Sequence, residues 1–136
     1  MKKILADLTI YRSNIQTIHW KIQGCNFIPI HKFTDKMYEE VNEFIDRVVE
    51  KYVQKEVEID TTLKTLMDNS TLSEETKLNI TVDEGIKKLI QDALSILTQV
   101  EKAYDDIEGL GSMDLILDDL RDYLEKTIWF LRKSLK

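Results

Sequence analysis

The chain has 136 residues, of which 43% are hydrophobic and 32% charged, and its formal net charge at pH 7 is −6. Four glycines and one proline are too few for the many turns of an all-β fold, and no apolar run approaches the roughly 20 residues of a membrane-spanning helix. The negative charge disfavours binding to nucleic-acid phosphates, and the single cysteine, Cys25, cannot form an internal disulfide, which is typical of a cytoplasmic protein.

The first half of the chain predicts two long amphipathic helices. Apolar residues at steps of three and four predict a helix from about residue 2 to 23, with the stripe Ile4, Leu8, Tyr11, Ile15, Ile18 and Ile22. We expect Gly24 to end this helix. The link through Pro29 is short, so a second helix over about 30–55 should return antiparallel to the first. Its core stripe is Phe33, Met37, Val41, Phe44, Val48 and Tyr52.

The middle of the chain, residues 57–80, is mixed. A short helix is expected over 60–67, because Leu63, Leu66 and Met67 share a face. The run 68–73 is polar and resembles a loop, and Thr71 followed by Glu74 has the spacing of a weak capping box.

Two further helices are predicted in the second half. One begins near Thr81, with Glu84 completing a capping box, and its stripe is Ile86, Leu89, Ile90, Ala93, Leu97, Val100 and Tyr104. Residues 109–111, Gly-Leu-Gly, end it. Ser112 is expected to cap the last helix, whose stripe is Leu117, Leu120, Leu124, Ile128 and Leu131.

These elements predict an all-α fold in one domain, residues 1–136. Four amphipathic helices with one longer connection, between the second and the third, are typical of a four-helix bundle. If the second and third helices are parallel, that connection crosses the length of the bundle, as in ferritin-like folds.

A candidate metal site lies on the second helix. On a helical wheel His31, Asp46 and Glu50 lie within about 60° of Asp35, on the face opposite the core stripe. Asp35 and Asp46 are eleven residues apart, about 16 Å along the axis, so the pairs His31/Asp35 and Asp46/Glu50 cannot share one ion within one chain. They could share one if a second copy of the helix packed antiparallel against the first, which would generate two equivalent sites per dimer.

The same residues can also be explained by ordinary structural roles without a metal ion. Carboxylates on the outer face of a helix are usually solvated, and His31 near a helix start is also typical of a cap or surface residue. His19, at the edge of the first helix's stripe, is more typical of a packed, hydrogen-bonded histidine than of a ligand. A site of imidazole and carboxylate ligands, in contrast, would suit iron, manganese or zinc.

The pattern His19-Trp20, Gly24, Phe27, His31, Asp35, Asp46 and Glu50 resembles the ferroxidase signature of the Dps family, the mini-ferritins. The resemblance implies a hollow dodecamer with 23 symmetry, in which His19, His31 and Asp35 of one subunit face Asp46 and Glu50 of its neighbour. It also implies that ferrous iron is bound there and oxidised, with hydrogen peroxide as the usual oxidant. Ferric oxide would then be stored in the cavity, protecting the cell from oxidative damage.

The resemblance implies further roles and leaves alternatives open. Asp114, Asp118 and Asp119 are candidates for an acidic iron-entry pore, with a solvated helix face as the plainer reading. Trp20 is a candidate electron donor, with packing at an interface as the alternative. The alternative functions are a nucleoid-associated DNA-binding protein with secondary iron chemistry and a helical-bundle interaction protein without catalysis. The chain starts almost at once with its first helix and ends in the short basic run 132–136, so DNA binding is expected to be weak or absent.

Overall fold

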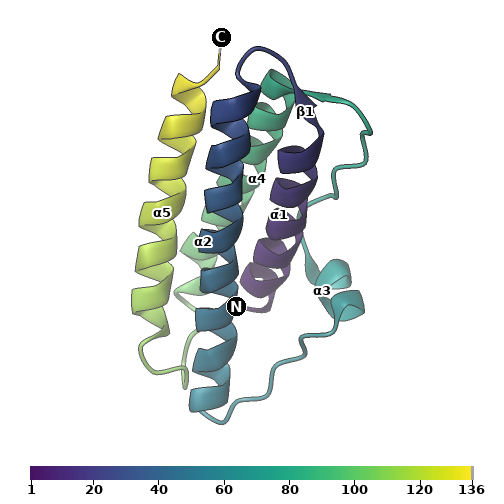
Figure 1. Cartoon of the computed structure of the whole chain (residues 1–136). Coiled ribbons are helices and arrows are strands. Elements are labelled where there is room, and N and C mark those ends of the chain that lie inside the picture. The colour runs from purple at the N-terminus through teal and green to yellow at the C-terminus, as the bar shows by residue number, and fades with distance from the viewer. Residues whose placement is uncertain (136) are drawn as a thin grey trace.

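Four long helices form the body of the protein. They are α1 (Lys2–Lys21), α2 (Phe27–Gln54), α4 (Val82–Ala103) and α5 (Met113–Lys133). The structure, a computed structural model, describes residues 1–135. Helices α2 and α4 run in the same direction, so the connection between them crosses the length of the bundle and carries the short helix α3 (Leu63–Asn69) (Figure 1). The predicted four-helix bundle with a long crossover is confirmed.

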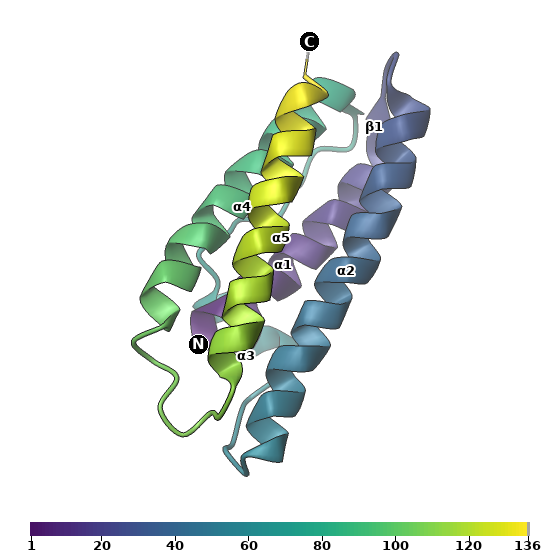
Figure 2. The same ribbon diagram turned by 90° about the vertical axis from the view of Figure 1, so that its left-hand side faces the viewer.

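The core is built largely from the predicted stripes. Every predicted core residue of α5 is buried, and the stripe of α2 is buried from Met37 to Tyr52, with Phe33 half-buried. Of the stripe predicted for this third long helix, Leu97 is only half-buried, whereas Ile96, which was not predicted, is fully buried. Tyr104, also half-buried, lies beyond α4, which ends at Ala103 and not at the predicted glycines of 109–111. Figure 2 shows α5 in front, between α4 and α2, with α1 behind it. No helix within residues 1–135 is long and apolar enough to cross a bilayer.

The first helix ends earlier than predicted. Helix α1 stops at Lys21, and Ile22–Gln23 form a short strand, β1, which pairs in parallel with β2 (Ile80–Thr81). Gly24 therefore lies in the turn after β1, with φ +137°, and does not itself end the helix. Gly85 lets α4 approach this region, since a Cβ there would lie 2.9 Å from methyl groups of both Ile18 and Ile22. The two strands anchor the start of α4 beside the end of α1.

Helix α2 begins earlier than predicted, at Phe27 instead of about residue 30. Pro29 is its third residue, a position where the backbone N–H has no partner within the helix, so the proline is tolerated there. The early start places His31 in the second turn of α2.

Helix α1 is buried on more sides than its stripe predicts. Asp7, Thr9 and Asn14 are buried as well, because α3 and the crossover cover the outer side of α1 (Figure 1). The fully buried Asp7 carboxylate accepts hydrogen bonds from Ser70 Oγ (2.8 Å), Thr71 N (2.6 Å) and Thr71 Oγ1 (2.7 Å). These bonds hold the crossover against the bundle.

A second buried polar cluster, around Asn14 of α1 and Asp92 of α4, contacts the crossover further along its course. Asn14 donates to Asp92 (2.9 Å) and to the Ser73 carbonyl (3.0 Å), while Lys88 pairs with Asp92 at 2.9 Å. Burial raises the pKa of Asp92, and the hydrogen bonds from Lys88 and Asn14 act in the opposite direction. The crossover is thus held by polar contacts at two separate places.

The predicted short helix in the crossover is confirmed, but its bounds, its apolar face and the predicted capping box after it were wrong. Helix α3 covers residues 63–69, not 60–67, and only Leu66 of its predicted apolar face is buried, whereas Leu63 and Met67 are exposed. No helix begins at Thr71, since the next one, α4, starts at Val82, so Thr71 and Glu74 do not form a capping box. Thr71 donates a hydrogen bond to Asp7 instead.

The predicted helix caps have mixed outcomes. At the start of α4, Thr81 Oγ1 accepts a hydrogen bond from Glu84 N at 3.1 Å, as expected. Ser112 occupies the N-cap position of α5, but its side chain makes no capping hydrogen bond. In the last helix only the position of the cap was therefore correct.

Helix α2 ends in a turn that would suit glycine but contains Glu56. This residue has φ +56°, Val57 N donates to Tyr52 O (2.9 Å), and Glu56 N donates to Val53 O (3.1 Å). This is the Schellman pattern, in which the left-handed position usually holds glycine.

We expect Glu56→Gly to raise the free energy of unfolding by about 1 kcal/mol, because glycine has no Cβ to strain the left-handed conformation. Chemical denaturation measures this change. In the matched control Glu58→Gly, at an exposed site outside the helices, glycine should leave stability unchanged or slightly lower. Equal stabilisation by both substitutions would contradict the explanation.

Candidate metal centre

Two histidines, one from each of two neighbouring helices, meet at one end of the bundle. His19 lies in the last turn of α1 and His31 in the second turn of α2, joined by β1 and the short turn after it. Their rings stack with centroids 3.8 Å apart and an interplanar angle of 12°. Phe27 stacks on the other face of His31 at 4.9 Å. The sequence contains no other histidine, so the fold brings together both imidazoles of the chain.

Hydrogen bonds fix the orientation of both rings. His19 Nδ1 lies 2.7 Å from the His31 carbonyl oxygen, and His31 Nδ1 lies 2.8 Å from the His19 carbonyl oxygen. Because a carbonyl oxygen only accepts, each Nδ1 must carry the proton and donate it. A neutral ring with its proton on Nδ1 has its lone pair on Nε2, and this is the arrangement usual for a metal-binding histidine.

Thr34 supports the histidine pair from within the core. It is fully buried, and its Oγ1 donates to the Ile30 carbonyl oxygen at 2.9 Å. The same oxygen lies 3.0 Å from His19 Nδ1 and serves as a second acceptor for that N–H. Thr34 was not predicted from the sequence; the only signal was a polar residue between two members of the apolar stripe, Phe33 and Met37.

The predicted carboxylate ligands lie on the solvent side of α2. Asp35, Asp46 and Glu50 are exposed, and none forms an ion pair with a residue in the range 1–135. Asp35 follows His31 by one helical turn, whereas Asp46 and Glu50 lie about 16 Å further along the axis. Within the same range no three His, Cys, Asp or Glu side chains are close enough to hold a metal ion. One chain thus carries an imidazole pair and, separately, a carboxylate pair, and the shared five-ligand site stays a prediction.

The three candidate pore residues lie in the first two turns of α5. Asp119 pairs with Arg47 at 2.8 Å, and Asp118 accepts a hydrogen bond from the Tyr104 hydroxyl. Asp114 is exposed. Two of the three carboxylates therefore have partners within the chain, and their assignment to a pore stays a prediction.

The remaining candidate residues lie at the surface. Trp20, the predicted electron donor, directly follows His19 and is 64% exposed. Cys25 is exposed in the turn before α2. Of the basic C-terminal run, Arg132 and Lys133 are exposed at the end of α5, and Lys136 lies outside the described residues.

Comparison with known proteins assigns the chain to a family. A family model described as a ferritin-like domain matches residues 1–136. A DNA protection during starvation protein of Streptococcus suis is 26% identical over 138 residues, covering 99% of this chain and 80% of the relative. The protein of that name from Helicobacter pylori is 25% identical, covering 99% and 95% of the two chains.

Solved structures have the same fold. Antigen TpF1 from Treponema pallidum superposes with a TM-score of 0.90 at 25% identity, covering 99% of this chain and 88% of that chain. Dps from Listeria monocytogenes superposes with a TM-score of 0.87 at 26% identity, covering 98% and 91%. The predicted ferritin-like fold is thereby confirmed.

Proposed function

The chain belongs to the Dps family of ferritin-like proteins, and on that basis we propose that it oxidises ferrous iron and stores the ferric product. The proposed site lies between two subunits. His19, His31 and Asp35 of one subunit would supply one side of it, and Asp46 and Glu50 of the neighbour the other.

One observation supports this proposal above the others: the stacked histidine pair, with both Nδ1 atoms held by backbone carbonyls. Packing alone would not require two neighbouring histidines that both hold Nδ1 at a backbone carbonyl and so leave Nε2 as the atom for a metal ion. Because His31 is followed one turn later by the exposed Asp35, a carboxylate is available next to the pair. A second α2 lying antiparallel would bring Asp46 and Glu50 to the same place.

The ligand types suit a change of iron oxidation state. Carboxylate oxygens are hard ligands that stabilise ferric over ferrous iron, and neutral imidazoles bind the ferrous ion without adding charge. Two ferrous ions lose one electron each, and hydrogen peroxide takes up both electrons and two protons to give two water molecules. Pairing the electrons in this way avoids the one-electron reduction that would release hydroxyl radical, so the reaction would protect the cell from oxidative damage.

The proposal includes assembly into a hollow dodecamer in the cytoplasm, where the ferric product would accumulate. Manganese or zinc could occupy the same ligands. We do not extend the proposal to DNA binding, although relatives are named for DNA protection, because the net charge of −6 opposes contact with phosphates.

Anaerobic addition of ferrous iron to the purified protein, followed by peroxide, tests the activity. Ferric absorbance should appear faster than in buffer, in a species about twelve times 16.0 kDa by size-exclusion chromatography. Bovine serum albumin at equal iron-to-protein ratio controls for nonspecific oxidation. A monomeric protein, or a rate equal to the control, would contradict the proposal.

Thr34→Val should weaken zinc binding at the proposed site about tenfold, because loss of a second hydrogen-bond partner loosens a metal-binding histidine. Isothermal titration with zinc, which has no redox chemistry, measures the effect. Valine has the same shape as threonine, and Thr34→Ser, which keeps the hydroxyl, is the matched control and should bind as the wild type does. Equal affinities for all three proteins would show that Thr34 acts only in packing.

A further inference from the structure

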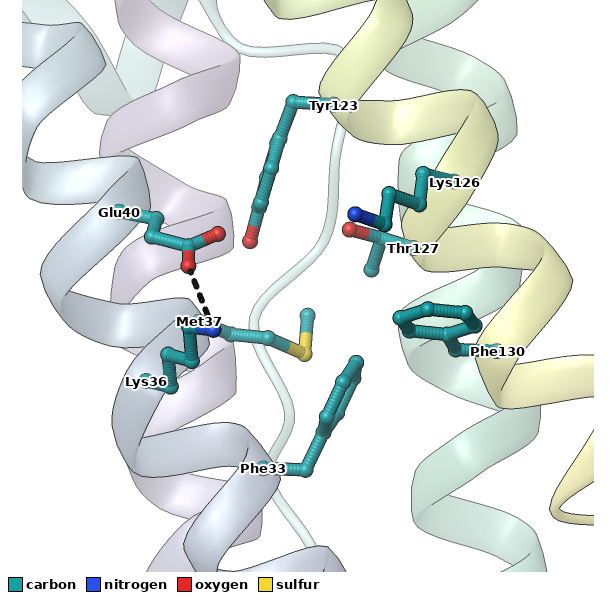
Figure 3. Close-up of a pocket in the computed structure, with 8 residues that line it drawn as sticks. All are labelled: Phe33, Lys36, Met37, Glu40, Tyr123, Lys126, Thr127 and Phe130. Atoms are coloured by element: carbon teal, nitrogen blue, oxygen red, sulfur yellow. Dashed lines mark ion pairs between the residues drawn. The ribbon is translucent and has the colours of Figure 1, made fainter.

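A cavity between α2 and α5 lies apart from the histidine pair. Its volume is about 120 Å³, and none of its lining residues is a predicted iron ligand. Figure 3 shows polar groups gathered at one end, where Tyr123, Glu40 and Thr127 meet, and two phenyl rings at the other. Such a division into an apolar part and a few convergent polar groups is typical of small-molecule sites.

The apolar part is lined by two aromatic rings and a methionine. Phe33 and Phe130 lie edge to face, with ring centroids 6.1 Å apart and planes at 64°, and Met37 forms the wall between them and the polar end (Figure 3). A closed apolar cavity of about 150 Å³ holds benzene, and this smaller one is open on one side, so a ligand ring need not be wholly enclosed. Aromatic rings and the methionine sulfur offer favourable contacts to a further ring.

The polar part contains a buried hydroxyl that lacks a partner. Among the described residues, Tyr123 Oη is the buried side-chain oxygen or nitrogen atom without a hydrogen bond. Figure 3 shows this hydroxyl pointing into the space between the two helices. Burial is the largest cause that raises the pKa of Tyr123. The nearby Glu40 carboxylate raises it further and Thr127 lowers it, so the hydroxyl stays protonated and is a donor. A ligand oxygen placed here would satisfy it.

The charges around the cavity favour an anion. Lys36 pairs with Glu40 at 3.7 Å, which offsets the carboxylate. Lys126 lies over the Phe130 ring at 5.5 Å and forms no ion pair with any of residues 1–135. The lining residues thus have a net charge of +1, from two lysines and one glutamate.

We propose that this cavity binds a small one-ring aromatic carboxylate, with the ring beside Phe33 and Phe130 and the carboxylate between Tyr123 Oη and Lys126 Nζ. An inorganic anion would leave the apolar end empty, and an aromatic amine would bring a second positive charge to Lys126. The site is separate from the iron chemistry proposed above, and its test does not depend on that proposal.

Binding of 4-fluorobenzoate to the assembled wild-type protein, followed by ¹⁹F NMR, tests the inference. We expect a dissociation constant of about 1 mM or below, within the range open to a ligand of this size. The neutral 4-fluorobenzamide should bind at least about tenfold more weakly, as should the cation 4-fluorobenzylamine, because neither offers a charge-assisted bond to lysine. No binding of 4-fluorobenzoate, or preference for the amine, would overturn the proposal.

Two substitutions locate the binding. Lys126→Met keeps the apolar stem and should weaken 4-fluorobenzoate about tenfold, whereas Lys87→Met, an equal charge change on the exposed side of α4, should not change it. If both lysine variants lose affinity equally, the binding is a general charge effect and the proposal fails.

Tyr123→Phe should raise the stability of the free protein and lower its affinity for 4-fluorobenzoate. Without the ligand it should raise the thermal midpoint by about 3 °C, because a buried hydroxyl without a partner is removed. It should nevertheless weaken 4-fluorobenzoate about tenfold, because the ligand loses its donor. Unchanged affinity in this folded variant would place the ligand elsewhere and overturn the assignment.

Discussion

His31→Ala and Asp46→Ala should each lower the rate of peroxide-dependent ferrous oxidation by at least about 100-fold, and reassembly of the two variants into mixed particles should restore part of it. His31→Ala removes one Nε2 of the stacked pair, while Asp46→Ala removes a carboxylate about 16 Å away on the same helix. If the site is shared between subunits, neither variant can assemble a complete ligand set by itself.

Co-assembly distinguishes a shared site from a site within one chain. In a two-fold pair of one His31→Ala and one Asp46→Ala subunit, one site lacks both ligands and the other is intact. After denaturation and reassembly of an equal mixture, half of the pairs are mixed, so about one quarter of the wild-type activity should return. Simple mixing without reassembly is the control and should restore nothing. No recovery in reassembled, correctly sized particles would exclude a shared site.

A matched surface substitution separates ligand loss from a change in surface charge. Glu43→Ala removes one carboxylate from α2, like Asp46→Ala, but Glu43 is not among the predicted ligands. It should keep close to the full oxidation rate. A loss as large as that of Asp46→Ala would show that the acidic surface of α2, rather than a specific ligand set, attracts the iron.

Asp7→Ala should lower the free energy of unfolding by about 3 kcal/mol and release the crossover from α1. The carboxylate is fully buried and accepts three hydrogen bonds from Ser70 and Thr71. Charge-assisted bonds of this kind contribute about 1.5–3 kcal/mol each before the cost of burying the charge is subtracted. Asp7→Asn keeps one acceptor oxygen, so its free energy of unfolding should fall by roughly half as much as that of Asp7→Ala.

Two measurements test the role of Asp7. Chemical denaturation gives the loss of stability, and hydrogen exchange should show faster exchange for the amides of residues 70–72 than in the wild type. Asp68→Ala, at an exposed position in α3, is the matched control and should leave both unchanged. A stability loss without faster exchange at 70–72 would mean that Asp7 supports α1 itself and not the crossover.

The sequence predicted the bundle well where one periodicity dominated. The stripes of α2 and α5 follow steps of three and four, and each of these helices turns a single face to the core. The prediction of the buried faces of α1 was less accurate, because a crossover 63 to 64 residues away in the sequence covers this helix on a second side. A buried Asp7 has no periodic signal, since its partners lie in a segment without regular structure.

The candidate site also has features that the sequence predicted and features that only the tertiary structure shows. The spacing of His31, Asp35, Asp46 and Glu50 on one helix face was readable from the sequence, because helix geometry alone sets it. That His19 lies beside His31 was expected only from the family resemblance, because helix geometry alone does not say how the turn after β1 returns the chain. Thr34 and the carbonyl partners of both rings were also beyond reach, since no sequence pattern records a hydrogen bond between helices.

The sequence by itself determined the helices, their core faces and the family, because helical periodicity and ligand spacing are local properties of the chain. Only the tertiary structure decided that two imidazoles stack with both Nδ1 atoms at backbone carbonyls, that the crossover is held by a buried carboxylate, and that Tyr123 directs an unpaired hydroxyl into a cavity. Each of these depends on residues from different helices or from the crossover, and so on the packing that brings them within hydrogen-bond distance.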